Sequence, residues 1–597
     1  MTTRGEALEV WAPQATRLEL ELCLDDGSHK RLPMKGVGGG RFTLPRAMVV
    51  GPYQLRVDGG DPIPDPRAES VRGVLGPCAL VDHDAFRWTD AAFEPPPLQG
   101  GLLYELHIGT FSEVGTFDGA IEKLRDLQEL GVTHVELMPV AAFSGRWGWG
   151  YDGAALFAPH PAYGGPEGLK RLVDACHAHG LAVIVDVVYN HLGSIGNFLG
   201  CYGPYFQADR HTPWGSAVNF DGPDCDEVRR FFIDNALGWL RHYHVDGLRL
   251  DAVHAIHDES AVPFLEELAG AVRDLSAELK KELLLIAESD LNDPRLIRPV
   301  EAHGLGLTAQ WCDDFHHALH VVLTGETAGY YADFAGETGA PLAHLQKALT
   351  RGFVYDGQRS PHRRRRHGRP LSGLSLSRLI GYAQTHDQVG NRARGERLSQ
   401  LVSPGKQKIA LALVLTGPFT PMLFMGEEWG ASTPFLFFTD HEDPAIAEAT
   451  RKGRRSEFAT FGWRPEDVPD PQSETTFLQS KLRWAEREMP PHRDVLAFTR
   501  ALVALRRQRP CLQDGAAEGV RVHVGDDALF VERGDLLVVV NLGQERPLRF
   551  PEGLANGRRS SLPGTAGRLL LASEDDVTVN HEGVHMPEES VAIIAMG

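Results

Sequence analysis

An alternation of short apolar strands and amphipathic helices begins near residue 101 and constrains the fold more than any other feature. Strands separated by helices pair in parallel, because each helical crossover returns the chain to the same end of the sheet. The strand candidates cover residues 102–106, 134–137, 182–188, 245–251, 283–288, 307–311, 380–385 and 421–425. Eight such units predict a (β/α)8 TIM barrel of the α/β class. The alternative, an open doubly wound sheet, would need a glycine-rich phosphate loop after the first strand, and the sequence has none there.

The two ends of the chain have a different pattern. Short alternating segments between residues 6 and about 90 are separated by Gly- and Pro-rich turns, which predicts an N-terminal immunoglobulin-like β-sandwich. From about residue 515 the alternation returns, with a hairpin signal at Gly534-Asp535, and predicts a C-terminal antiparallel β-domain. With a proline-rich joint at Glu94 to Pro97, we expect domains at 1–95, 96–512 and 513–597, the second with a short loop subdomain at about 190–226.

Charge and cysteine content exclude several classes of protein. A formal net charge of -20 argues against nucleic-acid or anionic-membrane binding, and the basic run His362 to His367 is the one local exception. Seven scattered cysteines without a CxxC pair indicate reduced thiols rather than disulfides or a zinc site. The N-terminus lacks the apolar core of a signal peptide, and Gly and Pro interrupt the apolar stretch Ile409 to Met425. The sequence therefore predicts a soluble cytoplasmic protein.

Polar side chains recur where four of the predicted strands end, and this is the edge at which barrels of this type place their active sites. They are Asp186 with Asn190 and His191, Arg249 with Asp251, Glu288, and His386 with Asp387. Each of these residues alone would be structural more often than not. At one level of four strands they favour a functional site.

Paired carboxylates suit cleavage of a glycosidic bond, in which one attacks the anomeric carbon and the other protonates the leaving oxygen. Asp251 lies beside Arg249 on one face of its strand, so it is expected to stay ionised and to act as the nucleophile. Glu288 ends an apolar strand, where desolvation would raise its pKa and suit it to be the general acid. The alternative is a divalent-metal hydrolase with Asp186, Asp251 and Asp387 as ligands, but no HExxH-like spacing supports it.

Four ordered motifs resemble the conserved regions of the α-amylase superfamily, glycoside hydrolase family 13. They are Asp186 to His191, Gly247 to Val253, Ala287 to Ser289 and Thr385 to Asn391. The resemblance implies a retaining mechanism on α-glucans, with Asp251 as nucleophile, Glu288 as acid/base and Asp387 as transition-state stabiliser. It also implies that Arg249, His191 and His386 hold the reacting sugar and that Tyr151 stacks on it.

Other stretches resemble one group within the superfamily, the maltooligosyltrehalose trehalohydrolases. They are residues 310–320, 426–435 with 438–441, and 360–370. This resemblance implies hydrolysis of the α-1,4 bond next to the terminal trehalose of maltooligosyl trehalose, with release of trehalose. It also implies a pathway partner, the synthase that makes this substrate, but no physical complex. The alternatives are a glycogen-branching transferase with the same catalytic residues and an inert glucan-binding protein.

The substrate must be held by polar groups that fit an α,α-1,1-linked glucose pair and leave a wrong sugar unpaired. The candidates for substrate binding are Tyr151, Asp186, His191, Arg249, His254, Trp311, Asp313, Asp314, His316, His386, Gln388 and Asn391. Calcium-dependent relatives use the asparagine at the position of Asn190 as a ligand. Here the loop around it is short and not rich enough in acids for a cation cage, so we expect no required metal and no cofactor.

Overall fold

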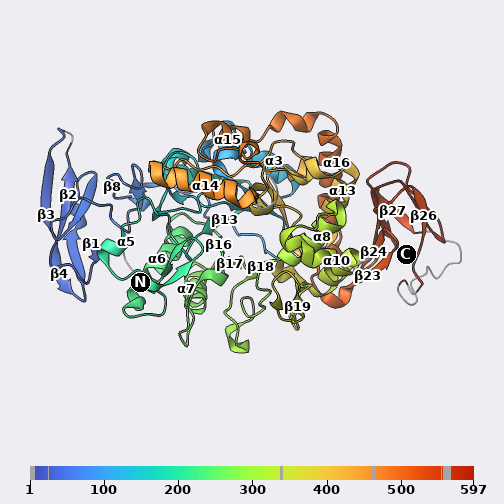
Figure 1. Cartoon of the computed structure of the whole chain (residues 1–597), viewed down its shortest axis with the longest axis horizontal. Helices are drawn as coiled ribbons and strands as arrows, with labels where there is room; N and C mark the ends of the chain where they lie inside the picture. Colours follow the sequence, from blue (N-terminus) through green and yellow to red (C-terminus); the bar gives the residue numbers. More distant parts are fainter. Residues whose placement is uncertain are drawn as a thin grey trace.

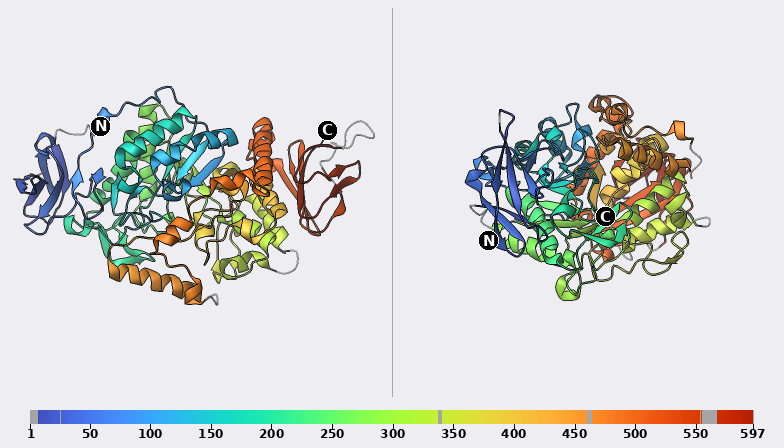
Figure 2. Two further views of the ribbon diagram at one scale, coloured as in Figure 1. Left: turned by 90° about the horizontal axis from the view of Figure 1, so that it is seen from above. Right: turned by 60° about the vertical axis from the view of Figure 1, so that its left-hand side comes forward.

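The computed structural model describes residues 7–24, 26–336, 340–459, 464–552, 554 and 567–596. The molecule is elongated, with antiparallel sheets from the two ends of the chain lying at opposite ends of a central barrel (Figure 1). A view from above shows the same order, with helices packed around the barrel and the terminal sheets on either side (Figure 2). The site at the barrel mouth is therefore built by the central part of the chain.

The barrel is closed and its eight strands are all parallel, which confirms the predicted fold class. In sequence order they are β9 (Leu103–Leu106), β10 (His134–Leu137), β13 (Ala182–Val187), β16 (Gly247–Leu250), β17 (Leu284–Ala287), β18 (Ala309–Trp311), β21 (Leu379–Gly381) and β22 (Thr420–Phe424). Leu103, Ile184, Leu284, Ile380 and Met422 fill the barrel interior as one buried apolar cluster. Side chains alternate along each strand, so Glu105 and Asp186, two positions beyond Leu103 and Ile184, lie in the layer next to the mouth.

Helices follow most of the strands and surround the barrel. The longer ones are α4 (Gly165–Ala178), α6 (Cys225–His242), α7 (Phe264–Leu279), α8 (Asp313–Thr324), α10 (Ala340–Arg351), α13 (Pro404–Thr416), α14 (Pro444–Ala459) and α16 (His492–Gln508). Between β9 and β10 the helical segment is divided into α2 (Phe117–Ile121) and α3 (Leu124–Leu130). The strand expected over 380–385 stops at Gly381, because Thr385 caps the short helix α11 (His386–Gly390) by accepting from the Asp387 amide. This cap places His386 and Asp387 at the barrel mouth.

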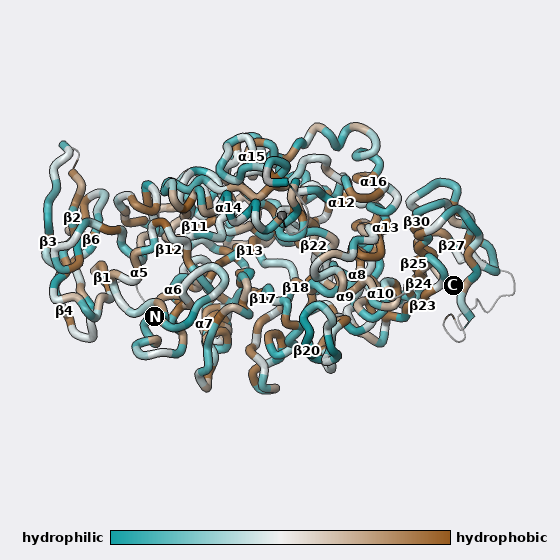
Figure 3. Tube along the Cα trace, in the orientation of Figure 1, coloured by the Kyte–Doolittle hydropathy of each residue, from teal (hydrophilic) through white to brown (hydrophobic). Residues whose placement is uncertain are grey.

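Antiparallel sheets flank the barrel on both sides. The N-terminal pair contains β1 (Ala7–Trp11), β5 (Arg41–Pro45) and β4 (Lys35–Gly38) in one sheet and β3 (His29–Pro33), β2 (Leu18–Cys23), β6 (Tyr53–Val57), β8 (Cys78–Ala79) and β7 (Ser70–Val71) in the other. The C-terminal pair contains β23 (Val520–Gly525), β24 (Ala528–Arg533), β25 (Leu536–Asn541), β30 (Ser590–Ala595) and β27 (Arg568–Ala572) in one sheet and β26 (Arg546–Arg549), β29 (Gly583–Met586) and β28 (Thr578–Val579) in the other. The apolar run of β25 lies in the middle of its sheet (Figure 3). The domain limits at 95/96 and 512/513 stay predictions.

A buried ionic cluster closes the end of the barrel opposite the mouth. His177 on α4 contacts Asp90 through Nδ1 and Asp246 through Nε2, both at 2.9 Å. Its ring also stacks on Phe93 with 4.0 Å between centroids, so the segment before the barrel is fastened to α4. Burial lowers the pKa of His177, but the hydrogen bonds to Asp246 and Asp90 outweigh it and raise the pKa above 6.5. The cluster therefore stabilises the fold while His177 is protonated.

We expect the stability that His177 contributes to decline as the pH rises. A histidine with a raised folded pKa contributes fully below its unfolded value of 6.5 and loses that contribution through the higher folded value. The variant His177→Gln should therefore lose about 3–5 kcal/mol near pH 6, as expected for a broken buried ion pair, and less near pH 9. Calorimetric melting of both proteins across this range measures the difference. A gap in Tm that does not change with pH would contradict the assignment.

All seven cysteines are free thiols. Within the described ranges, no helix is long and apolar enough to cross a membrane.

Candidate active site

The candidate catalytic carboxylates follow the carboxyl ends of three barrel strands. Asp251 directly follows β16 and Glu288 directly follows β17, and the two strands are paired in register. Asp387 lies in the first turn of α11, which follows β21. These three strand ends thus meet at one edge of the barrel, as the sequence led us to expect.

Arg249 connects the carboxylates. Its guanidinium is fully buried, and Nη1 donates to Asp251 Oδ1 and to Asp186 Oδ2, each at 2.8 Å. Nη2 lies 3.7 Å from Glu288 Oε2. One guanidinium therefore contacts three carboxyl groups, and two of them, Asp251 and Glu288, are held close together. Retaining glycosidases place their two carboxyl groups about 5–5.5 Å apart, and this arrangement is compatible with that spacing.

Two further contacts set the direction of these carboxylates. Asn190 Nδ2 donates to Asp251 Oδ2 at 2.9 Å and to the Asp251 carbonyl at 2.8 Å. The next residue, Ala252, has a φ of +39°, and its amide donates to Glu288 Oε2 at 2.6 Å. A non-glycine residue in this region costs about 1–2 kcal/mol. The turn after β16 therefore carries strain where it directs a backbone donor at the second carboxyl group.

The environments of Asp251 and Glu288 differ in a way that suits two roles. Burial raises the pKa of Glu288 well above its usual range, and although Arg249 opposes this, the charges of Asp251, Asp313 and Asp387 add to it. The protonated form of Glu288 is therefore favoured, and this form can donate a proton. Asp251 is engaged as an acceptor by a guanidinium and an amide, which leaves a carboxylate oriented for attack.

His386 is held by a residue that sequence reasoning missed, Glu105 on β9. Glu105 accepts from the His386 backbone amide at 3.0 Å and from the ring Nδ1, while ring Nε2 lies 3.5 Å from Asp387 Oδ1. Burial lowers the pKa of His386, but the charges of Glu105 and Asp387 outweigh it and raise the pKa to about 9. His386 is therefore a cation at neutral pH. Nothing in the short run of β9 separates Glu105 from an ordinary strand residue.

We expect Glu105→Gln to shift the alkaline limb of kcat/KM to lower pH. The substitution removes a charge that holds the proton on His386, so the ring becomes neutral earlier as the pH rises. A decrease of the pKa by one unit or more would lower kcat/KM about tenfold on that limb. The matched control is Glu136→Gln. Glu136 on the adjacent strand β10 is the register partner of Glu105, and burial already raises its pKa well above its usual range. A pH profile that moves equally in both variants would contradict this role.

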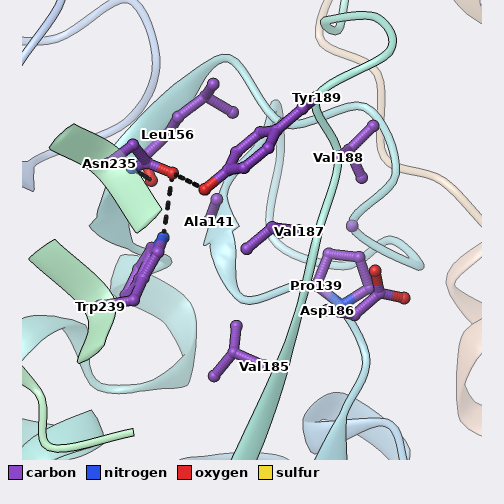
Figure 4. Close-up of a pocket in the computed structure, with 12 residues that line it drawn as sticks. Pro139, Ala141, Leu156, Val185, Asp186, Val187, Val188, Tyr189, Asn235 and Trp239 are labelled. Atoms are coloured by element: carbon purple, nitrogen blue, oxygen red, sulfur yellow. Dashed lines mark hydrogen bonds between the residues drawn. The ribbon is translucent and has the colours of Figure 1, made fainter. Parts of the chain in front are cut away.

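Tyr151 and Asp186 form one side of the candidate site. The Tyr151 hydroxyl donates to Asp186 Oδ2 at 2.6 Å, and its ring is stacked against His386 with 5.0 Å between centroids. Burial raises the pKa of Asp186 to about 7 although Arg249 opposes it. Figure 4 shows that Asp186 points away from Val185 and Val187, which face α6. Side chains alternate along β13, so the Asp186 carboxyl group lies on the face opposite to the two valines.

His191 carries a second feature that the sequence did not indicate. Its Nδ1 contacts Asn190 Oδ1, and its ring stacks on Trp214 at 5.2 Å between centroids. Trp214 lies in the turn between β14 (Phe206–Thr212) and β15 (Gly215–Val218) and is 51% exposed. An exposed indole over a site histidine extends the apolar surface available to a sugar ring. A lone tryptophan in a polar loop carried no signal of this position.

Four other residues that were predicted to bind the substrate differ in their surroundings. His254 is exposed, Asp313 accepts from the Tyr382 hydroxyl, and burial raises the pKa of Asp313 to about 7. Gln388 contacts Thr385, and Asn391 donates to Asp387 Oδ1 at 3.2 Å. These four lie at or near the mouth, and their contacts with sugar stay predictions.

Three other predicted residues are engaged within the protein. Trp311 is buried beneath the Arg249 guanidinium, which lies 4.3 Å from its ring centroid. Asp314 Oδ2 accepts from Asn292 and from the amides of residues 354 and 355 at 2.7–2.8 Å. His316 contacts the Ala383 carbonyl through Nδ1 at 2.8 Å and the Tyr331 hydroxyl through Nε2 at 3.2 Å. These contacts suit positioning roles, and contact of the three residues with substrate stays a prediction.

The residues around Asn190 do not form a cation cage. The Asn190 amide nitrogen is directed at Asp251, and its oxygen contacts His191. In the part of the chain that the structure describes, no group of three or more His, Cys, Asp or Glu residues is arranged to hold a metal ion. The absence of a required metal stays a prediction.

Comparisons with known proteins agree with this geometry. Residues 101–199 match the family model described as alpha amylase, catalytic domain. The chain is 48% identical over 593 residues to malto-oligosyltrehalose trehalohydrolase from Arthrobacter ramosus, covering 98% of this chain and 99% of the relative. It is 38% identical, with a TM-score of 0.87, to the crystal structure of a protein from Salmonella typhimurium provisionally named alpha amylase, covering 99% and 97% of the two chains. A 1,4-alpha-glucan branching enzyme from Xanthomonas campestris is more distant, at 29% identity over 70% of this chain and 59% of that enzyme.

Proposed function

Because the chain belongs to the malto-oligosyltrehalose trehalohydrolase family of the α-amylase superfamily, we propose that it is a retaining glycoside hydrolase that releases trehalose from maltooligosyl trehalose. The bond cleaved is the α-1,4-glucosidic bond next to the terminal trehalose. The observation that carries the chemistry is the single buried guanidinium of Arg249 between Asp251 and Glu288, which holds two carboxyl groups in unlike environments.

In the first step, Asp251 attacks the anomeric carbon while Glu288 gives its proton to the glycosidic oxygen. The carbon–oxygen bond breaks, trehalose leaves, and the maltooligosyl chain is bound to Asp251 as an ester. In the second step, Glu288, now ionised, takes a proton from water, and the water oxygen attacks the same carbon and releases Asp251. Asp387 and the His386 cation bind the hydroxyl groups of the reacting sugar, and Tyr151 and His191 line the subsite.

The test compares three substrates: maltooligosyl trehalose, a maltooligosaccharide of the same length, and amylose. Release of trehalose from the first, with little turnover of the second, supports the hydrolase. New branch points in amylose would instead identify a branching transferase, in which water is kept from the ester. No turnover of any substrate would identify a glucan-binding protein. The intact set of Asp251, Glu288 and Asp387 argues against that last outcome.

The supply of substrate and the cellular location belong to the same proposal. A substrate with a trehalose end requires a synthase that converts the reducing end of a maltooligosaccharide into the 1,1-linked pair. Seven free thiols suit a reducing compartment, so we place the reaction in the cytoplasm. The acidic net charge of -20 suits a neutral sugar rather than a nucleic acid.

A further inference from the structure

Helix α8 begins at the mouth and turns two different faces to its surroundings. Its first residue, Asp313, follows β18, and His317 lies one turn later on the same face of the helix. The neighbouring face carries His316, whose two nitrogens are both occupied, and His320, whose Nε2 contacts Glu326 at 2.8 Å. Among the described residues, by contrast, no partner hydrogen-bonds to either ring nitrogen of His317.

The Asp313 face of α8 looks toward the catalytic residues. Burial raises the pKa of Glu288, and the Asp313 charge adds to the shift, which places the two groups within electrostatic reach. Tyr330, in the turn η6 (Gly329–Tyr331), is likewise near the mouth: after burial, the charges of Asp387 and Asp313 raise its pKa. Its ring is 42% exposed and lies 4.7 Å from the ring of His317, centroid to centroid.

On its other side, His317 lies near an ion pair at the rim of the mouth. Arg363 Nη2 is 3.0 Å from Asp290 Oδ2, and Asp290 follows Glu288 by two residues. After burial, Arg363 and Asp290 both influence the pKa of His317, which is lowered to about 3. The imidazole is therefore neutral and offers one donor and one acceptor to a ligand.

Glu288 and the segment after it face the part of the substrate that leaves, because this residue protonates the leaving oxygen. Asp290 belongs to that segment and is paired with Arg363, and the charges of both residues act on His317, which places the ring near it. An exposed aromatic ring next to a neutral histidine with free nitrogens can hold a glucose unit. The ring covers the apolar face of the sugar, and the imidazole bonds its hydroxyl groups.

We infer that Tyr330 and His317 bind the trehalose end of the substrate and determine specificity for the 1,1-linked glucose pair. Tyr330 stacks on a glucose ring of the leaving pair, and His317 exchanges hydrogen bonds with its hydroxyl groups. A plain maltose end presents its second ring at a different angle, so it leaves the His317 nitrogens unpaired. This inference rests on the proposed release of trehalose and names the residues that select for it.

The experiment measures kcat/KM on maltooligosyl trehalose and on a maltooligosaccharide of equal length, together with competitive inhibition by trehalose. We expect Tyr330→Ala and His317→Ala to lower kcat/KM on the first substrate about tenfold or more, mainly through KM, and to weaken inhibition by trehalose to a similar degree. Activity on the maltooligosaccharide should change less, so the selectivity ratio falls. Tyr330→Phe retains the ring and should stay close to the wild type, and His317→Gln, which keeps a donor and an acceptor, should recover part of the loss.

Melting temperatures of the four variants show whether each one folds, and the conservative pair remains informative if an alanine variant does not. The inference is overturned if both substrates lose activity equally, or if trehalose inhibits all variants as it inhibits the wild type. Failure of the proposed function would look different, because the wild-type enzyme itself would then release no trehalose.

Discussion

Replacing Asp251 by asparagine is expected to lower kcat by about four orders of magnitude or more, because an amide is not a nucleophile and no glycosyl ester can form. The substitution preserves shape. Its amide oxygen can still accept from Arg249 Nη1, and Arg249 keeps its second contact at 2.8 Å to Asp186. The affinity for maltooligosyl trehalose should therefore change only a few-fold. Single-turnover kinetics measure the first effect, and calorimetric titration of the inactive protein measures the second.

A matched control lies on the same segment of chain. Asp246 immediately precedes β16 and is fully buried at the opposite end of the barrel, where Lys281 Nζ is 2.6 Å from its Oδ1. The variant Asp246→Asn should lower the melting temperature and leave kcat close to that of the wild type. If Asp251→Asn instead prevents folding, while turnover survives in any folded fraction, the pair Arg249–Asp251 would be structural and the nucleophile would have to be sought elsewhere.

The barrel could be predicted from the sequence because its signals are local. A strand between two helices has an apolar run, and a polar residue at the end of the run marks the edge where the strand leaves the barrel. This was enough for the eight strands and for Asp251, Glu288 and Asp387 at their ends. The positions at which the strands end could not be predicted as well. Residues 382–385 remain buried after β21 ends, and only the cap formed by Thr385 turns the chain into a helix.

The supporting residues could not be predicted, since they depend on which face of an element meets the barrel. His316 and His317 are adjacent in the sequence and equally polar, yet the Ala383 carbonyl and the Tyr331 hydroxyl occupy both ring nitrogens of His316. Within the described part of the chain, no group hydrogen-bonds to the ring of His317. Asp314 follows Asp313 directly, but it points to the amides of the loop at residues 354–355. Glu105 is recognisable only when β9 and α11 are placed side by side. Single-sequence reasoning thus reaches the candidate catalytic carboxylates and misses much of what orients them.

Replacing Glu288 by glutamine should lower kcat on maltooligosyl trehalose by about 10²–10⁴-fold, the range for loss of a general acid. Glutamine keeps the size of the side chain and can still accept from the Ala252 amide, which donates at 2.6 Å in the wild type. What it lacks is the proton that burial retains on Glu288 by raising its pKa. Steady-state kinetics on the natural substrate measure the loss.

An aryl maltooligosaccharide separates the two steps, because its leaving group departs without a proton. With this substrate Glu288→Gln should form the glycosyl ester rapidly and release it slowly, so a burst of phenolate precedes a slow steady state. Added azide needs no general base, so it should accelerate release and give a glycosyl azide with the α configuration of the substrate. In Asp251→Asn the azide would instead attack the substrate directly, and the product would have the β configuration. If azide gives the β product with Glu288→Gln, or no product with either variant, the assignment of Asp251 as nucleophile and Glu288 as general acid is wrong.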